Sequence, residues 1–154
     1  MVKLLASGFY ISYIPVRLMP GRKCSGAGLW GSVLAMFLTP LLPENSAFFA
    51  IFMTLFLPFS VWICTKADEG YGTHDDPRIV LDEIAGYWTA MAFLERDLPI
   101  MLGTLVLFRL LDTLKPGPIR WLDRLPGGLG VVADDVAAGI TANLVIRLAL
   151  MFAK

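Results

Sequence analysis

The chain has 154 residues, 56% of them hydrophobic, with 13 basic and 13 acidic residues and therefore no net charge. The hydrophobic share exceeds the roughly 45 to 50% of typical soluble domains. Contact with membrane lipid would account for the additional hydrophobic residues. Zero net charge argues against nucleic-acid binding through a general positive field. Two cysteines, Cys24 and Cys64, are too few for a disulfide framework. We expect a single membrane domain over residues 1–154.

The first part of the chain contains three apolar segments. Residues 4–16 predict an interfacial helix. Residues 24–43 and 45–65 are each about as long as the roughly 20 residues that a helix needs to cross a bilayer. They predict a membrane hairpin whose second helix is capped by Asn45. Basic residues before the hairpin place the N-terminus in the cytoplasm.

The middle of the chain alternates between polar and apolar segments. A polar loop is expected over residues 66–78, and the acidic residues Asp82 and Glu83 close this polar part of the chain. Two apolar runs follow, 84–94 and 98–108, each long enough for only about 16 Å of helix. Either each run draws flanking charged residues toward the membrane, or the pair enters the bilayer only partway. The sequence leaves both arrangements open.

The last part of the chain contains a basic polar segment and a final apolar run. Residues 109–135 have a bias toward Lys and Arg that again indicates the cytoplasmic side. Residues 136–153 are interrupted only by Arg147, which either reaches the interface or faces protein. The predicted fold class is an all-α, polytopic membrane bundle with its site in loops on the cytoplasmic face.

Acidic residues concentrate in the two loops that are predicted to share this face. Hard cations such as Mg²⁺ take oxygen ligands, typically one or two carboxylates together with waters and a substrate phosphate. The candidate ligands and catalytic acids are Asp82, Glu83, Asp112, Asp134 and Asp135. For Asp134 and Asp135 the alternative is capping of a helix beginning at Val136, worth about 0.3 to 1 kcal/mol each.

Several basic residues are candidates for phosphate binding. Arg109 and Asp112 are predicted to lie one turn apart on the same helix face, so an ion pair is an equally good explanation for Arg109. Lys115 and Arg120 follow, either as phosphate ligands or as lipid anchors. His74, the only histidine, has acidic neighbours that favour its protonated form and suit it to phosphate contact or proton transfer. A lone loop histidine, however, usually has no such role.

Three longer segments carry a more specific pattern. Residues 74–86 are similar to the pattern DPxxIVxDExxG, residues 108–120 to FRxxDxxKPxPI, and residues 127–139 to GGxGVxxDDxxAG. In this order and spacing they resemble the phosphatidylglycerophosphatase A family of small bacterial membrane enzymes, over roughly residues 25–145. In residues 26–32 the chain departs from the family, because Ala27 and Leu29 stand where a proline and a threonine are usual.

The resemblance implies a function and favours a metal site over capping. The expected reaction is Mg²⁺-dependent hydrolysis of phosphatidylglycerophosphate to phosphatidylglycerol, on the cytoplasmic side of a bacterial inner membrane. The expected Mg²⁺ ligands are Asp82, Glu83, Asp134 and Asp135. The expected phosphate ligands are Arg109, Lys115, Arg120 and His74. The attacking group is either water or Asp112.

Two alternatives from other classes remain at this point. One is a CDP-alcohol phosphatidyltransferase, which also uses acidic clusters with a divalent metal, although its DGxxAR pattern is missing here. The other is a non-enzymatic membrane scaffold whose charges only anchor loops to anionic lipid.

Overall fold

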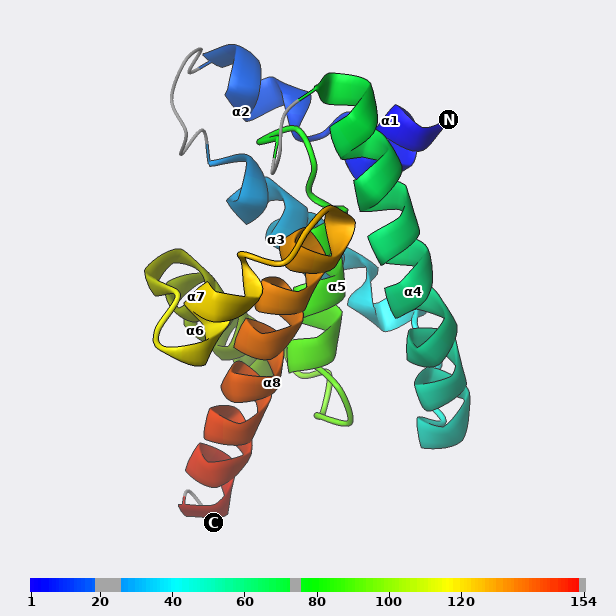
Figure 1. The fold of residues 1–154 in the computed structure, drawn as a ribbon. Helices are drawn as coiled ribbons and strands as arrows, with labels where there is room; N and C mark the ends of the chain where they lie inside the picture. The colour runs from blue at the N-terminus through cyan, green and yellow to red at the C-terminus, as the bar shows by residue number, and fades with distance from the viewer. Residues whose placement is uncertain (19–25, 73–75, 153–154) are drawn as a thin grey trace.

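A computed structural model describes residues 1–18, 26–72 and 76–152, and every regular element in these ranges is a helix (Figure 1). The helices in chain order are α1 (Val2–Ala6), α2 (Tyr13–Leu18), α3 (Ala27–Leu38), the 3₁₀ helix η1 (Thr39–Leu41), α4 (Ser46–Tyr71), α5 (Leu81–Ala90), α6 (Leu98–Leu114), α7 (Pro118–Leu122) and α8 (Gly128–Phe152). The predicted all-α fold is confirmed.

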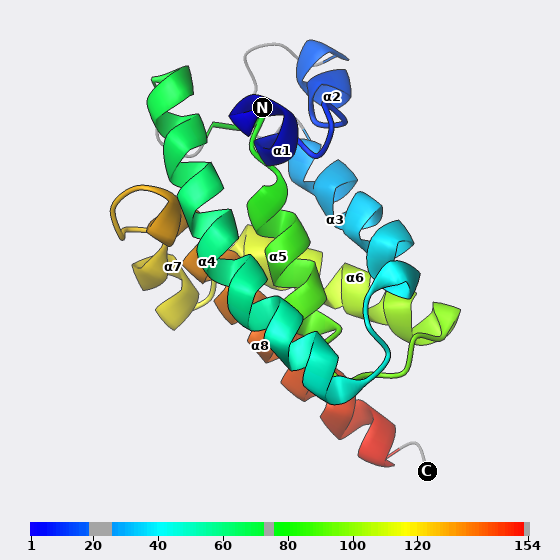
Figure 2. The same cartoon turned by 90° about the vertical axis from the view of Figure 1, so that its right-hand side faces the viewer.

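Helix α5 lies at the centre of the bundle, with α3, α4, α6 and α8 around it (Figure 2). Its contact with α8 is the most extensive between any two elements, and eight of its ten residues are buried. Tyr87 donates a hydrogen bond from Oη to the carbonyl of Met101 in α6. Trp88 donates from Nε1 to the carbonyl of Ala35 in α3. These side chains hold the short central helix to two of its neighbours.

Among the residues that the structure describes, two helices are long and apolar enough to cross a membrane, α4 with 26 residues and α8 with 25. At 1.5 Å per residue each reaches about 38 Å, which exceeds a hydrocarbon core of about 30 Å. The predicted span over residues 24–43 is shorter than expected, since α3 has 12 residues and gives way to η1, where Pro40 cannot continue the helix. Cys24 lies outside the described residues.

Rows of exposed apolar side chains follow the outer faces of α4, α6 and α8. On α6 the row is Leu98, Leu102, Val106, Leu110 and Leu114, a spacing of four that keeps one face of a helix. On α4 it includes Phe48, Ile51, Leu55, Phe59 and Trp62. Contiguous apolar surface of this extent is rare on soluble monomers and fits contact with lipid.

The N-terminal segment differs from the single helix predicted over residues 4–16. It forms α1 and α2, because Gly8, Phe9 and Tyr10 adopt positive φ angles of 57°, 58° and 66° that interrupt the helix. Helix α1 packs against α4 near its C-terminal end, and α2 packs against α3 (Figures 1 and 2). Gly8 sits close to Leu34 and Val80, so this turn is fixed by tertiary packing.

The ends of α4 illustrate one correct and one wrong prediction. Asn45 caps the helix as predicted, accepting hydrogen bonds at Oδ1 from the amides of Ala47 and Phe48. The loop predicted from residue 66 begins later, because α4 continues to Tyr71 and ends at Gly72 with φ of 73°. An ion pair of 2.7 Å between Lys66 and Glu69, spaced i,i+3, lies within the last turns of this helix.

Candidate active site

Three helices bring the acidic residues together. Helix α5 carries Asp82 and Glu83 in its first turn. Helix α6 carries Asp112 near its C-terminal end. Helix α8 carries Asp134 and Asp135, both only 3% exposed, where it packs against α5.

The carboxylates form two overlapping groups. Asp82, Glu83 and Asp135 each offer an oxygen atom that lies within 4.8 Å of the others. Asp112, Asp134 and Asp135 form a second group by the same criterion. Asp135 therefore belongs to both, and Asp134 groups with Asp112 and not with the two acids of α5.

The capping explanation for Asp134 and Asp135 is wrong. Helix α8 begins at Gly128, eight residues before the predicted start at Val136, and has no acidic residue in its first turn. The amide of Gly128 donates a hydrogen bond to Oγ1 of Thr65 in α4 at 3.0 Å. Both acids thus lie inside the helix, where their carboxylates cannot accept from its free first-turn amides.

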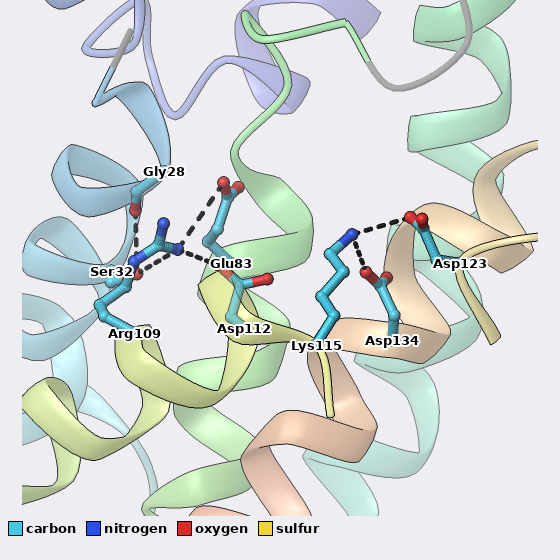
Figure 3. Close-up of polar contacts among 8 residues, drawn as sticks. All are labelled: Gly28, Ser32, Glu83, Arg109, Asp112, Lys115, Asp123 and Asp134. Carbon is cyan, nitrogen blue, oxygen red and sulfur yellow. Dashed lines mark hydrogen bonds and ion pairs between the residues drawn. The ribbon is translucent and has the colours of Figure 1, made fainter. Parts of the chain in front are cut away.

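Arg109 connects α6 with α3 and α5 (Figure 3). Its Nη1 lies 2.9 Å from Oδ2 of Asp112, which confirms that the two residues share a helix face. The same nitrogen lies 3.9 Å from Oε1 of Glu83 and donates to Oγ of Ser32 at 3.4 Å. Arg109 therefore adjoins both carboxylate groups, and its side chain remains 21% exposed to solvent.

Lys115 lies beside the second carboxylate group. Its Nζ is 2.6 Å from Oδ2 of Asp134 and 2.8 Å from Oδ1 of Asp123 (Figure 3). Burial lowers the pKa of Lys115, but the hydrogen bonds to the two carboxylates outweigh burial and hold the pKa above its ordinary value. The ammonium group therefore remains charged throughout the physiological pH range.

Two predicted phosphate ligands lie elsewhere or cannot be placed. Arg120 is on α7 and is exposed, and it makes no hydrogen bond or ion pair within the described ranges. His74 lies outside the described residues. Nearby, Arg78 pairs with Asp76 at 2.6 Å, a contact that raises the pKa of Arg78.

Two residues of α3 that were not predicted as site residues support Arg109. Ser32 is fully buried and donates from Oγ to the carbonyl of Gly28 at 2.9 Å while accepting from Arg109. A Cβ atom on Gly28 would overlap the Glu83 carboxylate and lie 2.8 Å from Nη2 of Arg109. The small residues Gly28, Gly31 and Ser32, spaced for one helix face, were a sequence signal for such close packing.

The carboxylates have the chemistry that a hard cation requires. Three buried oxygens, Glu83 Oε2, Asp134 Oδ1 and Asp135 Oδ2, accept no hydrogen bond from any residue that the structure describes. Buried polar atoms without partners are costly and rare. Burial and the neighbouring Asp82 raise the pKa of Glu83, so a positive ion would favour its ionised form. The groups therefore could hold a metal ion.

Comparison with known proteins decides the family. The family model described as Phosphatidylglycerophosphatase A matches residues 4–150. The chain belongs to the phosphatidylglycerophosphatase A family. The resemblance inferred from residues 74–86, 108–120 and 127–139 is thereby confirmed, and so is the prediction of an enzyme, a phosphatase.

Individual relatives of this phosphatidylglycerophosphatase A family chain cover most of its length. It is 34% identical to Phosphatidylglycerophosphatase A of Escherichia coli (strain K12), over 89% of this chain and 76% of the relative. It is 36% identical to the protein of that name in Haemophilus influenzae, over 77% and 76%. It is 29% identical to a putative phosphatidylinositol-3-phosphatase of Bacteroides thetaiotaomicron, over 95% and 91%. No solved structure matches.

Proposed function

We propose that this protein hydrolyses the phosphate monoester of phosphatidylglycerophosphate, releasing phosphatidylglycerol and phosphate, and that it requires Mg²⁺. Family membership supports the reaction. The observation that carries the metal requirement is the meeting of buried carboxylates from α5, α6 and α8, with three oxygens lacking hydrogen-bond donors among the described residues. The comparisons support neither the phosphatidyltransferase nor the scaffold.

The proposed metal ligands are Asp82, Glu83, Asp134 and Asp135. A bound Mg²⁺ would neutralise charge on the phosphate oxygens in the transition state. Arg109 and Lys115 would bind phosphate oxygens that face away from the ion, since each already lies beside a carboxylate of the site. Arg120 and His74 remain proposed as outer phosphate contacts.

Two chemical routes lead to the products. In the first, a water oxygen bonds to phosphorus as the bond to the glycerol oxygen breaks, and that oxygen leaves with a proton. In the second, an Asp112 oxygen bonds to phosphorus as the bond to the glycerol oxygen breaks and that oxygen leaves with a proton; a water oxygen then bonds to phosphorus, the bond to Asp112 breaks, and phosphate is released. In Asp112 one oxygen, Oδ2, is held by Arg109 at 2.9 Å. Acid quenching during turnover of a lipid labelled with ³²P in its monoester phosphate distinguishes the routes, because only the second leaves a labelled phosphoryl group on Asp112.

The proposed place of action is the cytoplasmic face of the inner membrane, with the chain crossing it several times. The apolar helices α4 and α8 support membrane association. Asp135 lies in the first half of α8, toward the end where that helix begins. A lipid substrate would keep its acyl chains in the bilayer and present its headgroup phosphate at this depth.

A second lipid monoester is a specific alternative substrate. The Bacteroides thetaiotaomicron relative, named for phosphatidylinositol-3-phosphate, matches 95% of this chain. The residues Ala27 and Leu29, unusual for the family, lie on α3 next to the Arg109 contacts. Assays with both lipids at equal mole fraction in the same detergent micelles would decide, since the true substrate should have the higher kcat/KM.

The deciding experiment is phosphate release from phosphatidylglycerophosphate by detergent-purified protein, with Mg²⁺ and with EDTA. Asp82→Asn and Asp135→Asn should each lose most of the Mg²⁺-dependent rate. Glu95→Gln is the matched control, because Glu95 is exposed in the turn beyond the other end of α5. Release that is insensitive to EDTA, or unchanged in both asparagine variants, would refute the metal-dependent mechanism.

A further inference from the structure

The two carboxylate groups share one residue, and this arrangement suggests more than one cation. Asp82 and Glu83 approach Asp135 from α5, whereas Asp112 approaches it from α6 and Asp134 adjoins it on α8. A carboxylate has two oxygens and can bind two ions at once. Asp135 is therefore placed to join two neighbouring cation positions.

The oxygens that lack partners are distributed over both groups. Glu83, with Oε2 unpartnered, is a residue of the first group, and Asp134, with Oδ1 unpartnered, is a residue of the second. Asp135, the residue they share, has Oδ2 unpartnered. Asp134 and Asp135 are each 97% buried, since only 3% of either is exposed. None of the three oxygens accepts a hydrogen bond from the residues described. A single ion beside α5 would leave Asp134 Oδ1 unsatisfied.

The basic residues do not satisfy the second group. Arg109 contacts Asp112 through Oδ2, and Lys115 contacts Asp134 through Oδ2. Each basic group thus uses one oxygen of its partner, and Asp134 Oδ1 stays without a donor among described residues. A cation at this group would give Asp134 Oδ1 the partner that the basic residues do not supply.

The net charge of the site also favours two cations over one. The five carboxylates of the two groups, with Arg109 and Lys115, carry a net formal charge of about −3. One divalent ion leaves about −1, which repels a phosphate monoester of charge about −2, whereas two ions leave about +1 and attract it. Asp123, at the rim beside Lys115, makes the site still more negative.

We propose that the site holds two divalent cations, with the Asp135 carboxylate bridging them. Asp82 and Glu83 complete one position, and Asp112 and Asp134 complete the other. This rests on the proposed metal-dependent phosphatase function and deepens it. When bound, a pair of cations about 3.5 to 4 Å apart can contact both the attacking and the leaving oxygen of a phosphoryl transfer. Arg109 and Lys115 would then hold the remaining phosphate oxygens from opposite sides.

The test counts ions directly and uses Mn²⁺ as the probe. Detergent-purified protein is stripped with chelator, dialysed to equilibrium against Mn²⁺, and measured for ions per chain and by electron paramagnetic resonance. The expected result is two Mn²⁺ per chain with the spectrum of an exchange-coupled pair. One Mn²⁺ per chain, or a spectrum of uncoupled ions, would overturn the proposal.

Single substitutions test which carboxylates hold each of the two cations. Asp82→Asn and Asp112→Asn should each reduce the count from two to one and abolish the coupling. Asp135→Asn should weaken both positions, whereas the exposed control Glu95→Gln keeps two coupled ions. Circular dichroism melting shows which variants are folded. If Asp112→Asn is folded and still binds a coupled pair, the second position is wrong.

The outcome also separates this proposal from the proposed function. Wild-type protein that releases phosphate from phosphatidylglycerophosphate in the presence of Mg²⁺ while binding a single Mn²⁺ keeps the function and rejects the pair. Protein that binds a coupled pair but releases no phosphate from that lipid keeps the pair and rejects the substrate.

Discussion

Gly139 of α8 lies so close to the carbonyl oxygen of Gly86 in α5 that a Cβ atom at position 139 would overlap it. A Cβ on Gly86 would in turn lie 2.7 Å from the ring of Phe108 and 2.8 Å from the carbonyl of Asp135. The absence of both Cβ atoms allows α5 and α8 to approach closely. This contact holds the acids of α5 beside those of α8.

We expect Gly139→Ala to destabilise the protein by about 1 to 3 kcal/mol and to lower phosphatase activity, because the added methyl group meets backbone and cannot be avoided by a side-chain rotation. Gly103→Ala is the matched control. A Cβ atom at position 103 would come no closer than 3.9 Å to Ile146. At an exposed helix position, alanine is more stabilising than glycine by up to about 1 kcal/mol. Unfolding in mixed detergent micelles measures both, and equal stability of the two variants would contradict the packing argument.

Gly28→Ala should reduce kcat/KM by about 10- to 100-fold, since small displacements of positioned groups cost this much. The added Cβ would overlap the Glu83 carboxylate and crowd both terminal nitrogens of Arg109. These are ends of side chains that can move, so we expect catalysis to suffer more than stability.

The control for position 28 is Gly70→Ala, whose Cβ would make only an ordinary contact of 3.5 Å with Lys3. Steady-state assays and thermal melts on both variants are the measurements. A Gly28→Ala protein with wild-type kcat/KM would show that the close approach of α3 has no part in holding Arg109.

Lys115→Met should destabilise the metal-free protein by about 3 to 5 kcal/mol, because it leaves the buried Asp134 carboxylate without its partner. Since contacts raise the pKa of Lys115, its stabilisation is fully present below about pH 10 and is lost as the pH rises through the higher folded value.

Lys66→Met is the control for this prediction, because Lys66 forms an exposed pair with Glu69 that is worth about 0 to 1 kcal/mol. Chemical unfolding of chelator-treated protein across the pH range measures both. A loss for Lys115→Met no larger than the loss for Lys66→Met would contradict a buried ion pair.

Arg109 and Arg120 should differ in how they affect kinetics. Arg109→Lys removes the planar guanidinium whose Nη1 contacts Ser32, Glu83 and Asp112, and we expect kcat to fall by about tenfold or more. Arg120→Ala should raise KM by only a few fold and leave kcat near wild type, because Arg120 is exposed on α7. Assays over a range of lipid mole fractions separate the two effects, and a large fall in kcat for Arg120→Ala would assign it to the reaction centre.

The sequence by itself determined the features that depend on local patterns. Apolar runs predicted helices and a membrane protein, Asn45 was recognised as a cap, and Arg109 was placed on the same helix face as Asp112. The motifs identified the family and named the acidic residues that the structure brings together. Each of these inferences uses residues within a few turns of one another, where helix geometry alone fixes the relation.

Only the tertiary structure decided how the acids are grouped. Helix α8 begins early because Gly128 packs against Thr65 of α4, and no signal near Val136 could reveal that distant contact. The place of Asp135 in two carboxylate groups depends on the approach of α5 and α6 to α8, which close packing between glycines permits. Such contacts join residues far apart in the chain, and they are set by side-chain shape and burial of the whole bundle.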